Sequence, residues 1–170
     1  SIVPLVLVII VWLRYSGGPL PNMIESVPWI PALGVGYKVG VDGFSLPLVA
    51  LSALLFPLSM AYPLDLRGCE RTYFGLFLFI EAASLGVFLA LDLFVFFVFF
   101  EAVLVPMYFL IAGWGHGRRD YAALKFFLYT LAGSAFLLVG LLAVVFLPAR
   151  GGPPITFDLH TLAHDQAVPG

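Results

Sequence analysis

The chain has 170 residues and a net charge of −2; 62% of its residues are hydrophobic, only 11% are charged, and its mean hydropathy is +1.06. Soluble domains carry roughly a quarter charged residues, so this composition excludes a soluble domain and predicts a membrane protein. The acidic balance leaves no basic surface for nucleic acid, and the single cysteine, Cys69, excludes an internal disulfide.

The N-terminal part predicts one incomplete and one complete membrane helix. A spanning helix needs about 20 apolar residues. Residues 1–15 begin without methionine and carry a shorter apolar run, which we interpret as the end of a truncated transmembrane helix in a fragment of a longer protein. Residues 16–43 are rich in Pro and Gly and are expected to form a loop. Residues 44–64 contain no charge and predict a transmembrane helix.

The apolar run over residues 73–112 is too long for one span. As a continuous helix its 40 residues would measure about 60 Å, twice the roughly 30 Å of a membrane core. The chain must therefore turn back, and Asp92 lies near the midpoint. We place transmembrane helices at 73–91 and 93–112.

Residues 121–147 form the last predicted transmembrane helix, which is long enough to be tilted. A polar tail follows over residues 148–170. The predicted fold is all-α: a polytopic bundle of transmembrane helices. We find no sequence repeat with a period of 20–50 residues.

Arginine placement predicts the orientation. The short loops 65–72 and 113–120 carry two arginines each and lie on the same side of the membrane by span parity. The basic residues of the opposite side are spread over much longer segments, 16–43 and 148–170. By the positive-inside rule the two short loops are cytoplasmic, and the two longer segments are external.

Two acids fall in the middle of predicted spans. Glu81 is the ninth residue of 73–91, and Glu101 is the ninth residue of 93–112. An acid at that depth costs at least ~2.5 kcal/mol on insertion scales, and such residues usually face a bundle interior or a water-filled cavity. Pro106 has no N–H and should kink the helix just after Glu101. Both acids are candidates for proton transfer, although each could instead be a neutral, hydrogen-bonded packing group.

Lys125 is the third ionisable residue within a predicted span. It lies five residues after Asp120, so its long side chain could reach back to the cytoplasmic interface or point into the bundle. Farther along this segment, three small residues are expected to let another helix approach closely: Gly133, Ser134 and Gly140.

Other motifs carry little functional signal. The sequence contains no GxGxxG, Walker loop, CxxC or HExxH motif, so no nucleotide, cluster or catalytic zinc is predicted from a short motif. His160 and His164 are four residues apart, but without a third nearby ligand we favour an exposed amphipathic segment over a metal site. Asp42 and Asp92 are expected to be turn or helix-start residues.

Three stretches together resemble a known family. GVDGFSLPLVALSALL, GVFLALDLFVFFVFFEAVLVPMYFLI and YAALKFFLYTLAGS are similar to the antiporter-like subunit M, or chain 4, of proton-translocating NADH:quinone oxidoreductase (respiratory complex I). The resemblance covers nearly the whole chain in the right order. It implies an antiporter-like fold with inverted repeats, of which this chain would be the N-terminal part.

The resemblance also implies roles for the three ionisable residues. Glu101, Glu81 and Lys125 match positions in that family's proton-translocation machinery, and the family's glutamate works with a lysine on a later helix that this sequence does not contain. No cofactor is expected on this chain: NADH, FMN, iron–sulfur clusters and quinone belong to other subunits. The implied partners are membrane-arm subunits, especially neighbouring antiporter-like ones, and the lipid bilayer of a bacterial plasma membrane, or alternatively of an energy-transducing organelle.

Two alternatives remain open from the sequence. The chain could belong to a cation/proton antiporter of the Mrp class, which would exchange Na⁺ or K⁺ for protons without oxidising NADH. It could also be a structural scaffold, in which both acids serve only as packing groups. The FFVFFEAVLVPMYF run, which surrounds Glu101, favours the complex I subunit over the Mrp antiporter.

Overall fold

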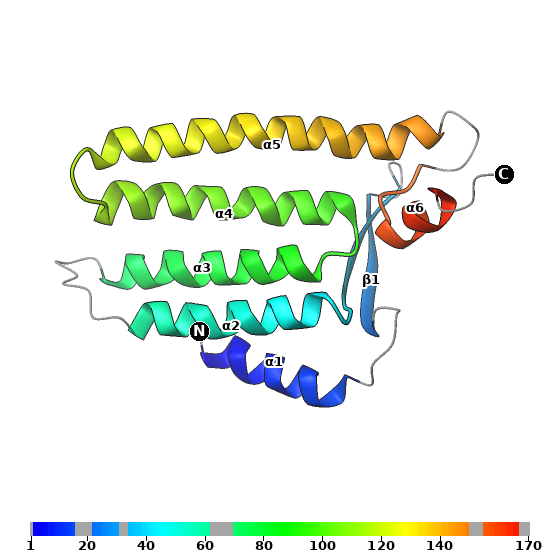
Figure 1. Cartoon of the computed structure of the whole chain (residues 1–170), viewed down its shortest axis with the longest axis horizontal. Helices are drawn as coiled ribbons and strands as arrows, with labels where there is room; N and C mark the ends of the chain where they lie inside the picture. The colour runs from blue at the N-terminus through cyan, green and yellow to red at the C-terminus, as the bar shows by residue number, and fades with distance from the viewer. Residues whose placement is uncertain (1, 16–21, 31–33, 62–69, 150–154, 167–170) are drawn as a thin grey trace.

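The computed structural model describes residues 2–15, 22–30, 34–61, 70–149 and 155–166. Five helices lie side by side in chain order, and each runs antiparallel to the one before it (Figure 1). They are α1 (Ile2–Arg14), α2 (Ser45–Ala61), α3 (Glu70–Leu89), α4 (Leu93–Trp114) and α5 (Arg119–Ala149). A β-hairpin and a short helix cover one end of this row. The all-α transmembrane architecture predicted from the sequence is therefore confirmed for the bundle.

Within the described ranges, three helices are long and apolar enough to cross a membrane: Glu70–Leu89, Leu93–Trp114 and Arg119–Leu147. They correspond to the predicted spans 73–91, 93–112 and 121–147. The turn that was expected at Asp92 is present, since α3 ends at Leu89 and α4 begins at Leu93. Of the expected loop 65–72, the last three residues form the first turn of α3, and the rest lies outside the described residues.

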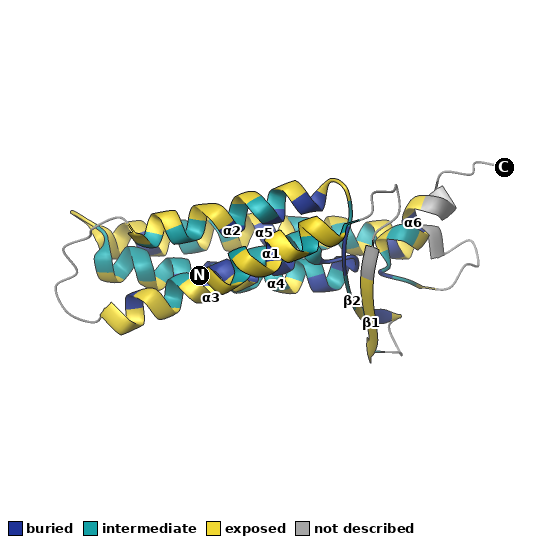
Figure 2. Ribbon diagram, turned by 90° about the horizontal axis from the view of Figure 1, so that it is seen from below, coloured by how far each residue is buried: buried dark blue, intermediate teal, exposed yellow. Residues whose placement is uncertain are grey.

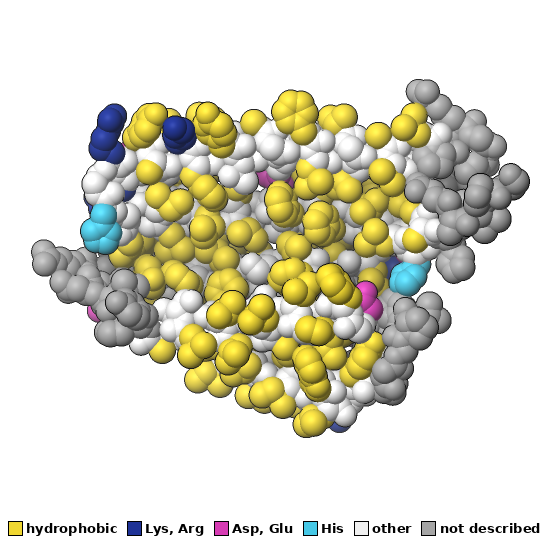
Figure 3. Space-filling model, in the orientation of Figure 1, with side chains coloured by type: hydrophobic (Ala, Val, Ile, Leu, Met, Phe, Trp, Pro, Cys, Tyr) yellow, Lys and Arg dark blue, Asp and Glu magenta, His cyan; other side chains and the backbone are white. Residues whose placement is uncertain are grey.

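The remaining apolar helices are shorter. α1 has 13 residues, and α2 has 17, so the predicted span 44–64 is helical only as far as Ala61 among the described residues. Large apolar side chains are exposed along the outer faces of all five helices (Figure 2). They also cover most of the face seen in Figure 3. Such a surface suits hydrocarbon rather than water. The predicted orientation in the membrane stays a prediction.

Residues 16–43 contain more than the loop we expected from the sequence. Strands β1 (Asn22–Ile30) and β2 (Val35–Val41) pair antiparallel. Gly34 precedes β2 with φ of 68°, and a Cβ at this position would collide with the backbone oxygen of Ile155. Glycine is required there both by the backbone conformation and by the close approach.

The tail 148–170 also contains an element that the sequence analysis did not assign. Residues Leu159–Gln166 form helix α6, and Leu162 is buried. A small core joins this helix to the hairpin and to the ends of α4 and α5; its buried members are Val35, Leu93, Val145, Phe157 and Leu162. The segment is amphipathic, as expected, but it docks on the end of the bundle.

Glycine contributes to helix packing at a position that differs from the predicted ones. A Cβ on Gly86 of α3 would overlap the ring of Phe99 on α4, so these helices approach closely there. By contrast, Gly133 and Gly140 are exposed, and nothing described lies within 4 Å of a Cβ built on either. Of the three small residues that were expected to admit a neighbouring helix, only Ser134 is buried.

Candidate functional site

Glu101 lies in the middle of α4, among aromatic and aliphatic residues. Helix α4 begins directly after Asp92, whose carboxylate caps its N-terminus by accepting hydrogen bonds from Phe94 N and Val95 N. Glu101 is half-buried, and its Oε1 atom is buried without a hydrogen-bond partner among the residues that the structure describes. A carboxyl oxygen in this state is costly unless a proton, a water or a further group satisfies it.

The face of α4 that carries Glu101 is turned toward α5. Tyr108 lies seven residues after Glu101, which is two helical turns, so the two residues share a face. The Tyr108 ring packs edge-on against Phe127 of α5, with ring centroids 5.7 Å apart. Pro106, which lies between Glu101 and Tyr108 in the sequence, is buried. Helix α4 continues through Pro106 to Trp114. The expected kink stays a prediction, but the missing N–H leaves the Ala102 carbonyl without its helical donor.

Glu81 is enclosed at a different helix interface. It is 1% exposed and is among the most buried side chains described. Leu85 follows it by four residues on the same face of α3 and packs against the cluster that contains Val49 and Ala53 of α2. Glu81 therefore lies on the face of α3 that also carries Leu85, whereas the face of α4 that carries Glu101 is turned toward α5.

Lys125 is exposed, and its Nζ lies 5.9 Å from the ring centroid of Tyr121 and 5.8 Å from that of Tyr129. The buried stripe of α5, which contains Ser134, faces α4 instead. Lys125 precedes Ser134 by nine residues, or about 13 Å along the helix. Within the described part of the chain, Lys125 thus does not point into the bundle and is not next to Glu101.

A cavity of about 410 Å³ opens between helices α2, α3, α4 and α5. Its walls are mainly apolar, with three hydroxyl groups among them, from Ser52, Ser84 and Thr130. Neither predicted acid is among the described residues that line it. The carboxyl groups therefore do not line the cavity. Two of its wall residues, Val103 and Leu104, come two and three residues after Glu101 on α4.

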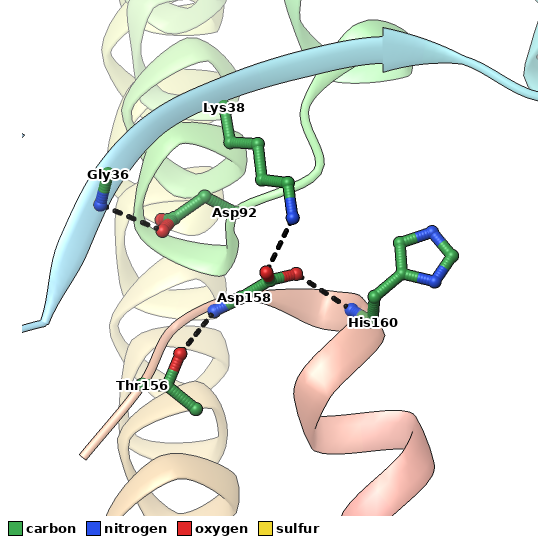
Figure 4. A network of polar contacts seen from close by, with 6 residues as sticks. All are labelled: Gly36, Lys38, Asp92, Thr156, Asp158 and His160. Carbon is green, nitrogen blue, oxygen red and sulfur yellow. Dashed lines mark hydrogen bonds and ion pairs between the residues drawn. The ribbon is translucent and has the colours of Figure 1, made fainter. Parts of the chain in front are cut away.

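A polar network fastens the hairpin and α6 to the turn between α3 and α4 (Figure 4). Asp92 is 2% exposed, and its Oδ2 accepts a hydrogen bond from Gly36 N at 3.2 Å. Lys38 of β2 forms an ion pair with Asp158, with Nζ and Oδ2 2.5 Å apart. The second Asp158 oxygen accepts a hydrogen bond from His160 N at the start of α6.

Backbone bonds reinforce this network. Leu91 N donates to Lys38 O, Leu93 N donates to Phe157 O, and Leu159 N donates to Leu91 O, at 2.9 to 3.0 Å. The helix-start roles predicted for Asp42 and Asp92 are confirmed, because Asp42 accepts from Phe44 N and Ser45 N. The long-range partners were missed, since nothing local in the sequence links residues 56 or 120 positions apart.

The ion pair makes the docking of α6 depend on pH. Burial alone would raise the pKa of Asp158, but Lys38 and the N–H of His160 outweigh it and hold that pKa below its ordinary value. A lowered folded-state pKa means that the pair stabilises the protein above about pH 4 and that this contribution is lost as pH falls from there through the folded pKa.

We expect Lys38→Met to lower the free energy of unfolding by roughly 1 kcal/mol at pH 7, as for other partly exposed pairs. The difference from wild type should be smaller at pH 3, below the ordinary pKa of an aspartate, because the stabilisation by the ion pair declines as pH falls toward the lowered pKa of Asp158. Denaturant titration in detergent at both pH values, on single and double variants of Lys38 and Asp158→Asn, measures this coupling. A coupling that is equal at both pH values would contradict the assignment.

The alternative of a metal site at the two histidines is not tested by the structure. His160 and His164 both lie in α6, but the His164 side chain is outside the described part of the structure. Among the described residues, no group of three or more His, Cys, Asp or Glu side chains could hold a metal ion. The interpretation as an amphipathic segment holds for α6.

A row of apolar helices that encloses two carboxylic acids defines a class: polytopic membrane proteins with ionisable groups inside the bundle. Comparisons with known proteins narrow this class. The family described as NADH:quinone oxidoreductase/Mrp antiporter, TM matches residues 90–163. This part of the chain is therefore similar to that family.

A protein of Picosynechococcus sp. named NAD(P)H-quinone oxidoreductase chain 4 3 is 44% identical over 145 residues, which are 85% of this chain and 26% of that relative. A chain of respiratory complex I from Thermus thermophilus superposes with a TM-score of 0.79 at 32% identity, over 94% of this chain and 32% of that one. A chain of the Mrp complex from Dietzia sp. superposes with a TM-score of 0.72 at 28% identity, over 94% of this chain and 17% of that one. The chain thus spans about a quarter of the length of the curated relative.

Proposed function

We propose that this chain is part of a proton-translocating membrane-arm subunit of an NADH:quinone oxidoreductase, with Glu101 as a proton carrier. The subunit holds no redox centre of its own: NADH, FMN, iron–sulfur clusters and quinone are handled by other subunits. Its partners are the neighbouring antiporter-like subunits, and its location is a bacterial plasma membrane.

The buried Oε1 atom of Glu101, which has no hydrogen-bond partner in the described part of the chain, carries this proposal. A carboxyl group that is enclosed by hydrocarbon and has an unused acceptor can exist as a neutral acid, and it becomes an anion only when a cation or water reaches it. Intramembrane acids that pair and unpair in this way are typical of proton paths.

Coupling to a redox reaction elsewhere follows from the same physics. Leaving a buried charge without its partner costs several kcal/mol, so moving a cation toward or away from Glu101 changes its affinity for a proton strongly. A conformational change that originates in another subunit could therefore load and unload this carboxyl group. Glu81, which is buried on α3, and Lys125, which is exposed on α5, are proposed as further members of the path.

The experiment uses inside-out membrane vesicles from cells with and without the complete subunit. We expect NADH oxidation to drive proton uptake only when the subunit is present, with quinone as electron acceptor and without added Na⁺ or K⁺. Unchanged NADH-driven uptake in its absence would overturn the proposal.

The second candidate is a cation/proton antiporter subunit. The superposition on a chain of the Mrp complex favours it, although the identity there is 28% compared with 44% for the quinone oxidoreductase relative. The same vesicles distinguish the antiporter from the quinone oxidoreductase subunit. An antiporter dissipates an imposed proton gradient when Na⁺ or K⁺ is added, and it does so without NADH.

A further inference from the structure

Two cationic side chains at the start of α5 share one tyrosine ring. The guanidinium carbon of Arg118 lies 5.0 Å from the ring centroid of Tyr121, and Nζ of Lys125 lies 5.9 Å from the same centroid. All three side chains are exposed, whereas Ala123 is fully buried. Because a step of two residues turns a helix by about 200°, Tyr121 and Lys125 both face away from the packed side of α5 that holds Ala123. Figure 3 shows these cations along the outer edge of α5, with apolar side chains between them.

These two cations lack a counter-charge. In the part of the chain that the structure describes, neither Arg118 nor Lys125 forms an ion pair with a carboxylate. The nearest acid in the sequence, Asp120, lies about 140° around the helix from Lys125. Arg119 differs from its neighbour, because its Nη1 donates to Gly113 O at 2.9 Å. The N–H groups of Arg118 and Lys125 are therefore available to an anion from outside the described chain, and such an anion would relieve the repulsion between them.

The depth of this patch in a membrane indicates which anion it would meet. The membrane-crossing part of α5 has 29 residues and is about 43 Å long. A hydrocarbon core is about 30 Å thick, and the whole bilayer with its headgroups is about 40–45 Å thick, so the first turns of α5 reach the headgroup region. Tyrosines are enriched at that level, and a lysine near a helix end extends its side chain toward it.

The surface next to the patch suits hydrocarbon chains. Leu124 and Leu128 are 50% and 53% exposed, and Leu128 follows Tyr121 by seven residues, or two helical turns, on the same face. An anion that lies at headgroup level and carries apolar chains is a phospholipid. A zwitterionic headgroup would bring its own cation next to Arg118 and Lys125, so the charge of the patch favours an anionic lipid.

We propose that Arg118, Tyr121 and Lys125 form a binding site for the phosphate of an anionic phospholipid, whose acyl chains lie along Leu124 and Leu128. The two cations hold the phosphate oxygens, and the tyrosine ring keeps the cations together. This site goes beyond the proposed function and does not depend on it, because lipid binding requires only the charge of Lys125 and not the transfer of its proton.

The test is photo-crosslinking of the assembled complex, with the full-length subunit, in phosphatidylcholine nanodiscs. One sample contains a small fraction of a phosphatidylglycerol probe with a diazirine in its acyl chain, and the other contains a phosphatidylcholine probe with the same chain. We expect the anionic probe to label α5 near Leu128 at least about fivefold more than the zwitterionic probe. Arg118→Gln should lower labelling by the anionic probe about fivefold, the usual contribution of one cation near a membrane surface, whereas Arg118→Lys should retain most of it.

Arg71→Gln is the matched control. Arg71 is also exposed, in the first turn of α3 on the predicted cytoplasmic side, but it contacts no aromatic ring among the described residues. This variant should leave the labelling of α5 unchanged. An excess of inorganic phosphate at constant ionic strength should also leave it unchanged, and displacement of the probe by phosphate would mean that the ligand is a soluble anion.

Three further results would overturn the inference. They are equal labelling by the two probes, equal effects of Arg118→Gln and Arg71→Gln, and no labelling of α5 in complexes that assemble normally. The last result is expected if another protein segment, rather than lipid, covers this face of α5 in the complex. Because the measurement is labelling by lipid and not proton uptake, failure of this inference leaves the proposed function untouched.

Discussion

Replacement of Glu101 by glutamine is expected to abolish proton pumping by the assembled complex while leaving the subunit in place. Glutamine has nearly the same size but cannot bind and release a proton. Positioned groups that transfer protons contribute typically about 10²- to 10⁴-fold to rates, so a fall of at least roughly 100-fold is expected. Because Glu101 Oε1 makes no hydrogen bond to the described residues, the substitution removes none at that atom, and assembly should survive.

The measurement is proton uptake by inside-out vesicles during NADH oxidation, normalised to the amount of assembled complex. Glu70→Gln is a suitable control, since Glu70 is exposed in the first turn of α3. It should pump like wild type. Near-normal pumping by Glu101→Gln with normal assembly would favour the scaffold hypothesis, which also expects Glu81→Gln to be silent.

The long helices could be predicted from the sequence because membrane thickness fixes their length. The apolar run before and after Asp92 was too long for one span, and an aspartate that can cap a helix marked the place of the turn. The predicted bounds of each span also gave the depth of its residues in the membrane, and this depth identified Glu81 and Glu101 as acids in the middle of their spans. These are local properties, read from one segment at a time.

The hairpin and α6 were missed because their stability is not local. β1 contains Pro28 and is largely exposed, so it shows no clean alternation of apolar and polar residues. Its pairing with β2 and the docking of α6 depend on partners such as Asp92 and Asp158, which come from distant parts of the sequence.

Side-chain direction was the least predictable part of the candidate site. The resemblance favoured a role for Lys125 within the bundle, but this side chain faces outward between two tyrosines on the side of α5 away from α4. Of the small residues that were interpreted as packing positions, Ser134 is buried, but Gly133 and Gly140 are exposed. Single-sequence patterns give the face of a helix but not the neighbour that this face meets.

Removal of the Asp92 carboxylate is expected to be the most destabilising single polar change. Asp92→Ala loses two cap bonds to α4 and the bond from Gly36 N of the hairpin. Loss of a helix cap costs about 0.5–2 kcal/mol, and a buried donor left without an acceptor costs about 1–3 kcal/mol. We therefore expect a loss of about 3 kcal/mol in the free energy of unfolding, measured by denaturant titration in detergent.

Two comparisons separate the cap from the link to the hairpin. Asp92→Asn keeps one acceptor oxygen for the cap, so it should lose chiefly the bond from Gly36 N and cost about 1 kcal/mol. Asp42→Ala removes a cap of the same kind from α2, at a position that is less buried, and should cost about 1 kcal/mol. Equal losses for Asp92→Ala and Asp42→Ala would mean that the hairpin gains nothing from Asp92. A larger loss for Asp92→Ala means that one carboxylate both caps α4 and fixes the hairpin to the bundle.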